Sequence, residues 1–220
     1  TAYLLHRVLS PSKPLVLTAA MRPATALSAD GPANLADAVT VARHADARGV
    51  LVVVAGAVHA GCEVRKLATT ALDAFSSGDA GPVARVDGDV LRVLRPWPTG
   101  AALGLQSIAQ DAAQWPTVAV LASHAGATGL EVDALVASGV AGLVVAATGN
   151  GTLHHRLEAA LVRAQHRGVR ILRATRCAQG RIIDPNSASI PHAAHLTPAQ
   201  ARVQLLLALL ATSPSSRSHT

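Results

Sequence analysis

The stretch from residue 140 to residue 174 reads VAGLVVAATGNGTLHHRLEAALVRAQHRGVRILRA, and it decides the fold class. Residues 140–147 and 169–174 are short apolar runs, which are typical of buried strands. Between them, a glycine-rich turn leads into a helical stretch, for which Thr152 is a fair N-cap. A strand, a helix and a second strand in this order predict a parallel pair joined by a right-handed crossover.

The same alternation continues on both sides of this stretch. Residues 117–122 predict a strand, and a helix follows that is closed by Gly139. Residues 176–195 are expected to form a loop. A last helix then opens with Thr197 as its N-cap and Pro198 as its first residue.

The first half of the chain carries two apolar runs that predict strands. They cover residues 13–18 and 50–56. The second run is apolar at consecutive positions, so we expect both of its faces to be covered, as in a parallel sheet between helix layers. Residues 1–9 predict a helix, because their leucines and valine fall on one stripe.

A longer helix is predicted over residues 33–47, between these two strands. Its expected apolar face consists of Leu35, Ala38, Val39 and Ala42, which follow helical spacing. We expect this face to pack on the sheet.

Alternating strands and helices place the chain in the α/β class, with mainly parallel sheets. Residues 82–98 alternate and then meet two prolines, which predicts a hairpin leaving the first domain. Residues 99–116 have little periodicity and are interpreted as a linker. The prediction is therefore two domains, over residues 1–98 and 117–220.

The composition excludes several classes of function. Half of the residues are hydrophobic and 15% are charged, which is typical of a packed globular protein. The net charge of +6 comes from scattered Lys and Arg, and one Phe and one Tyr cannot form a stacking platform, so we expect no nucleic-acid partner. No apolar stretch is long enough to span a membrane, and no signal peptide is visible.

The cysteines and histidines do not predict a metal site. Cys62 and Cys177 are far apart and have no neighbours at ligand spacing, so they indicate neither a disulfide framework nor a zinc site. His154 and His155 are adjacent and would point away from each other on a helix. We therefore expect solvated histidines and no metal.

Three loops are expected at the carboxyl ends of strands, where ligands bind in α/β sheets. They cover residues 19–23, 57–66 and 148–152. The Gly149-Asn150-Gly151 segment could present backbone N–H groups to an anion, or it could be only a tight turn. Lys66 in the second loop could be functional, or only a solvated charge.

Four blocks of the sequence resemble the bacterial L-asparaginases of the asparaginase/glutaminase family. They are KPLVLTAAMRPATALSADGPANLADAV (13–39), GVLVVVAGAVHAGCEVRKLATTALDAF (49–75), VAGLVVAATGNGTL (140–153) and LTPAQARVQLLLALL (196–210). The blocks cover the chain in order. The resemblance implies a Rossmann-like, parallel-sheet N-terminal domain and a smaller α/β C-terminal domain. It makes an unrelated doubly wound binding domain a poor alternative.

The resemblance also implies a reaction. The family hydrolyses the side-chain amide of L-asparagine to L-aspartate and ammonia, through an acyl-enzyme on a threonine. A second threonine, an aspartate and a lysine activate the attack. The nucleophile lies in a Gly-Gly-Thr-Ile segment and the Thr-Asp pair in His-Gly-Thr-Asp-Thr; neither occurs in the 220 residues. We therefore expect the N-terminal domain to be incomplete here and the nucleophile to be absent from this chain.

Four positions match family site residues. Lys66 matches the catalytic lysine, although Arg65 stands where the family commonly has threonine. Ala20 matches the residue whose backbone carbonyl holds the substrate amide. Thr152 matches a position, commonly Asn or Ser, that a neighbouring subunit contributes. The family often adds a glutamate from the loop after the last strand, where this chain offers only Asp184.

The resulting hypothesis is an L-asparaginase without metal or organic cofactor. Its substrate would be L-asparagine, with L-glutamine as a second candidate, and the protein would be a homotetramer. The alternative is a catalytically inactive, asparaginase-like binding or assembly protein. Two unpaired cysteines favour the cytoplasm, with the periplasm as the alternative if a signal peptide lies upstream.

Overall fold

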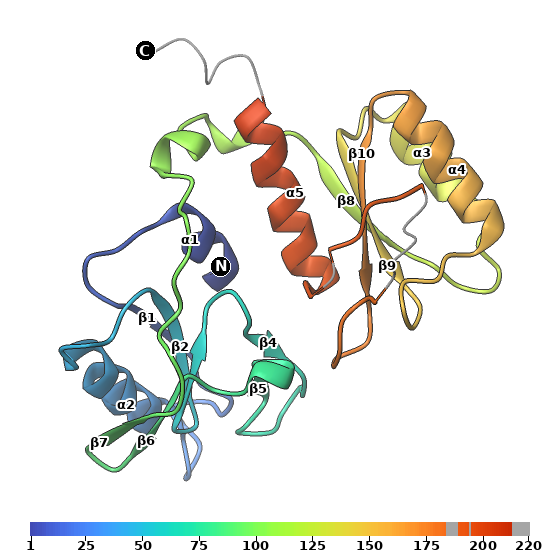
Figure 1. The fold of residues 1–220 in the computed structure, drawn as a ribbon. Helices are drawn as coiled ribbons and strands as arrows, with labels where there is room; N and C mark the ends of the chain where they lie inside the picture. The colour runs from blue at the N-terminus through green and yellow to red at the C-terminus, as the bar shows by residue number, and fades with distance from the viewer. Residues whose placement is uncertain (184–188, 194, 213–220) are drawn as a thin grey trace. The chain divides into compact units, whose positions relative to one another are not determined.

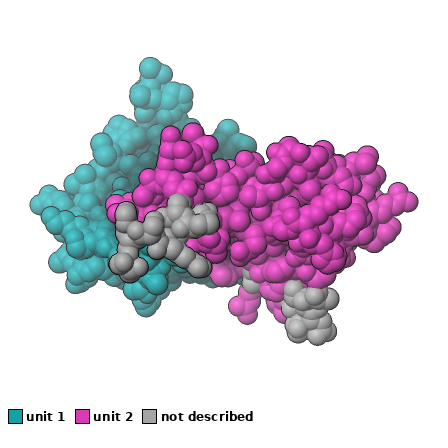
Figure 2. All heavy atoms as spheres, turned by 90° about the horizontal axis from the view of Figure 1, so that it is seen from above, with its two compact units in different colours: residues 1–104 teal, residues 105–220 magenta. Residues whose placement is uncertain are grey.

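The computed structural model describes residues 1–183, 189–193 and 195–212. Figure 1 shows its helices and strands along the chain. Two compact units make up the chain, Thr1–Gly104 and Leu105–Thr220, which Figure 2 shows in teal and magenta.

Unit 1 is built on a five-stranded sheet in the order β1-β2-β3-β6-β7. β1 and β2 are parallel, and the other three pairs are antiparallel. The sheet is therefore mixed, and the expectation of a mainly parallel sheet is wrong for this unit. The strands are β1 Leu15–Thr18, β2 Val50–Val54, β3 Ala57–Ala60, β6 Ala84–Asp87 and β7 Val90–Val93.

The antiparallel part of this sheet begins at a tight turn after β2. Ala55 has φ 50° and Gly56 has φ 71°, so the chain reverses in two residues and returns as β3. The prediction of a single loop over residues 57–66 is therefore wrong at its start. β6 and β7 form the expected hairpin, but β6 pairs with β3, so the hairpin extends the sheet and does not leave it.

Two helices belong to this unit, α1 Ala2–Val8 and α2 Gly31–Arg43. β2 is buried at all five positions, as its apolar run predicted. Ala38 and Val41 of α2 pack on the sheet in one core cluster with Leu51, Val53, Val58, Ala84 and Val86.

The expected apolar face of α2 is only partly correct. Ala38 is buried, but Leu35 and Val39 are 58% and 48% exposed. The buried face instead runs through Asn34, Ala38 and Val41. Asn34 occupies a core position because its amide group is fully used in hydrogen bonds, which hydrophobicity alone does not reveal.

The segment between β3 and β6 adds a small ribbon. It consists of β4 Arg65–Lys66, β5 Phe75–Ser76 and the 3-10 helix η1 Gly78–Ala80. β4 and β5 are antiparallel, with Arg65 opposite Ser76 and Lys66 opposite Phe75. Lys66 therefore lies in a short strand and not in an open loop.

Unit 2 has the predicted α/β fold, and its elements form three layers (Figure 1). Its three strands are all parallel, in the order β10-β9-β8. Helices α3 and α4 pack on one face, and α5 covers the other. The elements are β8 Val118–Ala122, α3 Leu130–Ala137, β9 Gly142–Ala147, α4 His155–His166, β10 Arg170–Thr175 and α5 Pro198–Thr212. Two short 3-10 helices, Leu105–Ile108 and Ala112–Gln114, precede β8.

Of the two N-caps predicted for helices of unit 2, one is confirmed and the other is wrong. Thr197 caps α5: its hydroxyl accepts from the Gln200 N–H, and the Gln200 side chain accepts from the Thr197 N–H. This reciprocal pair is a capping box. Thr152 does not cap α4, because His154 takes that role and its Nδ1 accepts from the Arg156 N–H.

The helices that the structure describes are too short, or not apolar enough, to cross a lipid bilayer.

Candidate functional site

The loop after β1 carries Ala20, the first of the predicted site residues. Its backbone is fixed by Asp30, the residue before α2, whose carboxylate accepts hydrogen bonds from the N–H groups of Met21 and Arg22 at 2.9 Å. The hydrogen bond from Met21 is the largest cause that lowers the pKa of Asp30, so this carboxylate stays ionised. The loop is thus tied to the start of the helix.

Asn34 holds the same loop from inside the fold. Its side-chain amide donates to the Ala19 carbonyl at 2.8 Å and to Asp30 at 3.0 Å. Its side-chain oxygen accepts from the Ala55 N–H at 2.9 Å, in the turn after β2. One buried side chain, 3% exposed, therefore joins the ends of two parallel strands.

These bonds explain the SADGPxN block at residues 28–34. Ser28 accepts from the Arg22 guanidinium through its hydroxyl, at 2.6 Å, and through its carbonyl. With Asp30 and Asn34, each polar residue of the block holds backbone or side chain of the loop. In the sequence, the block indicated only a resemblance, and these positioning roles were not predicted. The polar residues that follow β1 in this block were a signal for such bonds, but their partners could not be named from the sequence.

Ala20 itself is exposed at the end of this pinned loop. Its carbonyl accepts no hydrogen bond from the part of the chain that the structure describes. A fixed backbone with an open carbonyl can accept a hydrogen bond from an amide of a ligand.

Lys66 is the predicted catalytic residue, and it is exposed in β4. Its Nζ atom lies 5.8 Å from the centre of the Phe75 ring, on the partner strand β5. An ammonium at this distance over an aromatic face is attracted by the ring's negative quadrupole. The ribbon therefore holds Lys66 in place through both the backbone ladder and the ring.

Thr152 lies in unit 2, in the loop between β9 and α4. The loop closes on itself: the N–H groups of Gly151 and Thr152 both donate to the Thr148 carbonyl, at 3.0 and 2.9 Å. Gly149 and Gly151 have φ 48° and 89°. The segment is therefore a tight turn. The N–H groups of Gly151 and Thr152 donate within this turn, so the interpretation that the segment presents its N–H groups to an anion is wrong for these two groups.

Residues outside this loop also hold it in place through hydrogen bonds. Asn150 exchanges two hydrogen bonds of 2.6 Å with the backbone N–H and carbonyl of Ile183. The Thr175 hydroxyl donates to the Gly149 carbonyl, and the Arg173 guanidinium donates to the Gly151 carbonyl. These bonds fix the backbone that presents Thr152, whose side chain is exposed.

The structure brings Ala20 and Lys66 into unit 1 and Thr152 into unit 2. Asp184 lies outside the described residues. Among residues 1–183, 189–193 and 195–212, no three or more His, Cys, Asp or Glu side chains are grouped so that they could hold a metal ion.

A buried histidine in unit 1 was also missed by the sequence analysis. His59 in β3 is 4% exposed, and its Nδ1 atom lies 2.9 Å from the Ser77 hydroxyl. Burial, with smaller effects of Arg85 and Arg95, lowers the pKa of His59 from 6.5 to about 4. Alternation within a short strand did not mark this position, because the neighbouring residues are alanine and valine.

The His59 pKa predicts how stability depends on pH. Because the folded state favours the neutral ring, this contribution is complete above pH 6.5 and is lost as the pH falls towards 4. The free energy of unfolding should fall by about 3 kcal/mol over this range, because each pKa unit between the folded and unfolded states corresponds to about 1.36 kcal/mol. Urea unfolding at several pH values is the measurement. A His59→Gln variant should show a clearly weaker loss over this range, and an equal loss would contradict the assignment.

Two family models match this chain, one in each half. Residues 1–99 match the family model "Asparaginase, N-terminal", and residues 117–218 match "Glutaminase/Asparaginase C-terminal domain". L-asparaginase 2 of Escherichia coli is 35% identical over 96% of this chain and 63% of its own length. A glutaminase-asparaginase of Acinetobacter glutaminasificans is 32% identical over 97% of this chain and 67% of its own length.

A solved structure has the same fold. The crystal structure of a probable cytoplasmic L-asparaginase from Campylobacter jejuni has a TM-score of 0.87 and 29% sequence identity, over 96% of this chain and 69% of that one. The chain spans about three fifths of the length of the first curated relatives that it matches.

Proposed function

The chain belongs to the asparaginase family of amidohydrolases, and from this premise we propose that the complete protein is an L-asparaginase. It hydrolyses the side-chain amide of L-asparagine to L-aspartate and ammonia. The observation that carries the proposal is the loop after β1, which Asp30 and Asn34 hold while the Ala20 carbonyl stays open. Such a carbonyl suits the NH₂ group of a substrate amide.

The proposed mechanism is covalent. A threonine hydroxyl attacks the amide carbon, ammonia leaves, and water then hydrolyses the resulting ester to release L-aspartate. Lys66 orients the relay that takes the proton from the hydroxyl and stabilises the negative charge that develops. Ala20 holds the amide. The 220 residues contain neither the Gly-Gly-Thr-Ile nor the His-Gly-Thr-Asp-Thr segment of the family, so the nucleophile is not among them.

The proposed assembly is a homotetramer in which neighbouring subunits complete each other's sites. Thr152 reaches into the neighbouring site, and its pinned turn suits that role. Asp184 is the proposed acidic partner. In this proposal, residues 1–98 are the part of the catalytic domain that this chain contains. Residues 99–116 are the linker, and residues 117–220 are the C-terminal domain.

L-asparagine is the proposed main substrate, and L-glutamine the second, since relatives are named for one or both. We propose no metal, organic cofactor, nucleic acid or membrane partner. The proposed compartment is the cytoplasm, as in the name of the Campylobacter protein, with the periplasm as the alternative.

The proposal is tested by ammonia release from L-asparagine and L-glutamine. The complete protein should release one L-aspartate for each ammonia. The purified 220-residue polypeptide should release no more ammonia than its Lys66→Ala variant, because a site without its nucleophile retains only residual catalysis. Activity of the polypeptide above that control would contradict the absent nucleophile.

The alternative is an asparaginase-like protein that binds or assembles without turnover. Arg65, where the family commonly has threonine, is the observation that favours it, because a guanidinium replaces the hydroxyl of that threonine. Saturable binding of L-asparagine by the complete protein, with no ammonia release, would establish this alternative.

Thr152→Ala in the complete protein should lower kcat/KM by about tenfold, the value of one lost hydrogen bond. Part of the effect should appear in KM, because Thr152 is proposed to shape the pocket for the substrate. Steady-state kinetics check this. Thr148→Ala is the matched control, since its hydroxyl bonds within the turn, and it should change KM less. Equal effects of the two changes would contradict the role of Thr152.

A further inference from the structure

Unit 1 contains a cavity of about 300 Å³ that the proposed function does not use. It lies beside the turn after β2, and we call it the His59 cavity. Its polar and aromatic lining consists of His59, Asp73, Phe75, Ser76, Ser77 and Arg85. This volume is at the lower end of the range for small-molecule sites.

The cavity has buried polar groups in its lining. His59 and Ser77 are 4% and 3% exposed, and the Ser77 hydroxyl lies 2.9 Å from His59 Nδ1. His59 is neutral at neutral pH, because its pKa lies at about 4. The pair therefore offers donor and acceptor groups without a charge, which suits a polar, uncharged part of a ligand.

Two exposed side chains of opposite charge also line the cavity. Asp73 supplies a carboxylate and Arg85 a guanidinium. Neither forms an ion pair or a side-chain hydrogen bond within the residues that the structure describes, whereas the nearby Arg95 is paired with Glu63. One unpaired cation and one unpaired anion on a single cavity are complementary to a zwitterion.

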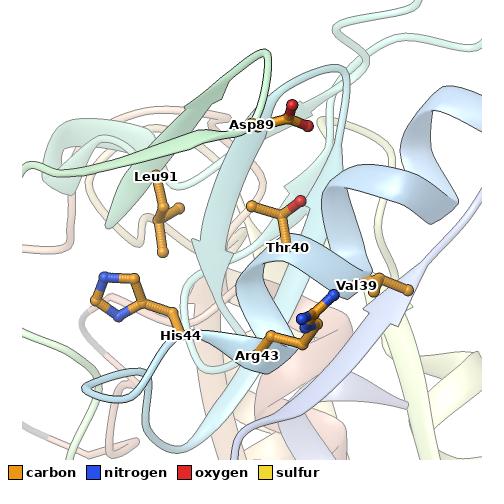
Figure 3. A pocket seen from close by; sticks show the side chains of 6 residues that line it. All are labelled: Val39, Thr40, Arg43, His44, Asp89 and Leu91. Carbon is orange, nitrogen blue, oxygen red and sulfur yellow. The ribbon is translucent and has the colours of Figure 1, made fainter.

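A larger groove in the same unit also carries a cation and an anion, but it has no buried polar group in its lining. Figure 3 shows it between the end of α2 and the β6–β7 hairpin, with Arg43, His44 and Asp89 on its walls. Its volume is about 430 Å³, but none of the residues that line it is buried. It therefore serves as the control surface.

We propose that the His59 cavity binds a small polar α-amino acid as the zwitterion. Arg85 binds its carboxylate, Asp73 binds its ammonium group, and its polar side chain lies against His59, Ser76 and Ser77. This site needs neither the catalytic threonines nor Lys66, so it goes beyond the proposed function and can be tested on the 220-residue chain.

The test is calorimetric or NMR titration of the 220-residue chain with L-serine and L-asparagine. Both should bind saturably. N-acetyl-L-serine amide, which lacks both charges, should not bind. Asp73→Asn keeps the side-chain shape, and Arg85→Gln keeps a polar side chain; both remove a charge at an exposed position. Each should weaken binding by about tenfold or more, as expected for a lost charge-assisted hydrogen bond.

Three matched variants complete the experiment. Asp79→Asn changes an exposed carboxylate close by in sequence, and Arg43→Gln changes a cation of the larger groove; both should keep wild-type affinity. Lys13→Met, at an exposed lysine before β1, should also keep it. The proposal is overturned if no saturable binding occurs, if the blocked compound binds equally, or if Arg43→Gln or Lys13→Met weakens binding as much as Arg85→Gln.

Discussion

Replacing Lys66 with methionine in the complete protein should lower kcat by about 100-fold or more, the usual cost of removing one catalytic electrostatic group. Methionine keeps much of the side-chain volume and can still lie over Phe75, but it carries no charge. KM should change less, because the ammonium is proposed to act on the proton relay and the transition state, and not on the bound substrate. Steady-state kinetics with L-asparagine separate the two parameters.

The chain offers a matched control for this substitution. Lys13 is its only other lysine, and it is exposed before β1. Lys13→Met should leave kcat and KM unchanged. If Lys66→Met keeps a kcat near that of the unchanged protein, Lys66 is only a solvated charge and the proposed catalytic role is wrong.

Asn34→Ala should destabilise unit 1 by about 3 kcal/mol, since it removes the three hydrogen bonds of the buried Asn34 side chain, each worth about 1 kcal/mol. The same change frees the loop that carries Ala20. In the complete protein, kcat/KM should therefore fall further than the loss of folded protein explains. Urea unfolding of the chain measures the first effect, and kinetics on the folded fraction measure the second.

Leu35→Ala is the control for Asn34→Ala. It removes a larger side chain at the next position of α2, but Leu35 is 58% exposed. Its effect should stay within about 0.5 kcal/mol, as for most surface substitutions. If Leu35→Ala lowered the free energy of unfolding as much as Asn34→Ala, Leu35 would lie on the buried face of α2, which would contradict the structure.

The fold of unit 2 could be predicted from its sequence because each strand is a continuous apolar run between recognisable helices. Unit 1 was harder. The turn at Ala55 places an alanine at φ 50°, where sequence patterns lead one to expect glycine or asparagine, so β3 was taken as a loop. The face of α2 was also misjudged, because Asn34 is buried through hydrogen bonds that depend on residues far away in sequence.

The candidate site divides in the same way. Lys66, Ala20 and Thr152 could be proposed from resemblance, because they stand in recognisable blocks. The hydrogen bonds that hold these residues in place could not be proposed from the sequence, because they connect separate parts of the chain. They join the Asp30 carboxylate to backbone N–H groups and the Asn150 side chain to Ile183. The two charged residues on the His59 cavity, Asp73 and Arg85, come from separate segments, which only the folded chain brings together.

The central claim is that the complete protein is an L-asparaginase whose site joins Lys66 of one subunit with Thr152 of another. Co-expression of the Lys66→Met and Thr152→Ala variants tests it most directly, by ammonia release from L-asparagine. In mixed oligomers, some sites combine an intact Lys66 with an intact Thr152. The activity should therefore exceed the mean of the two separate variants several-fold. An activity equal to that mean, or no hydrolysis by the unsubstituted protein, would contradict the claim.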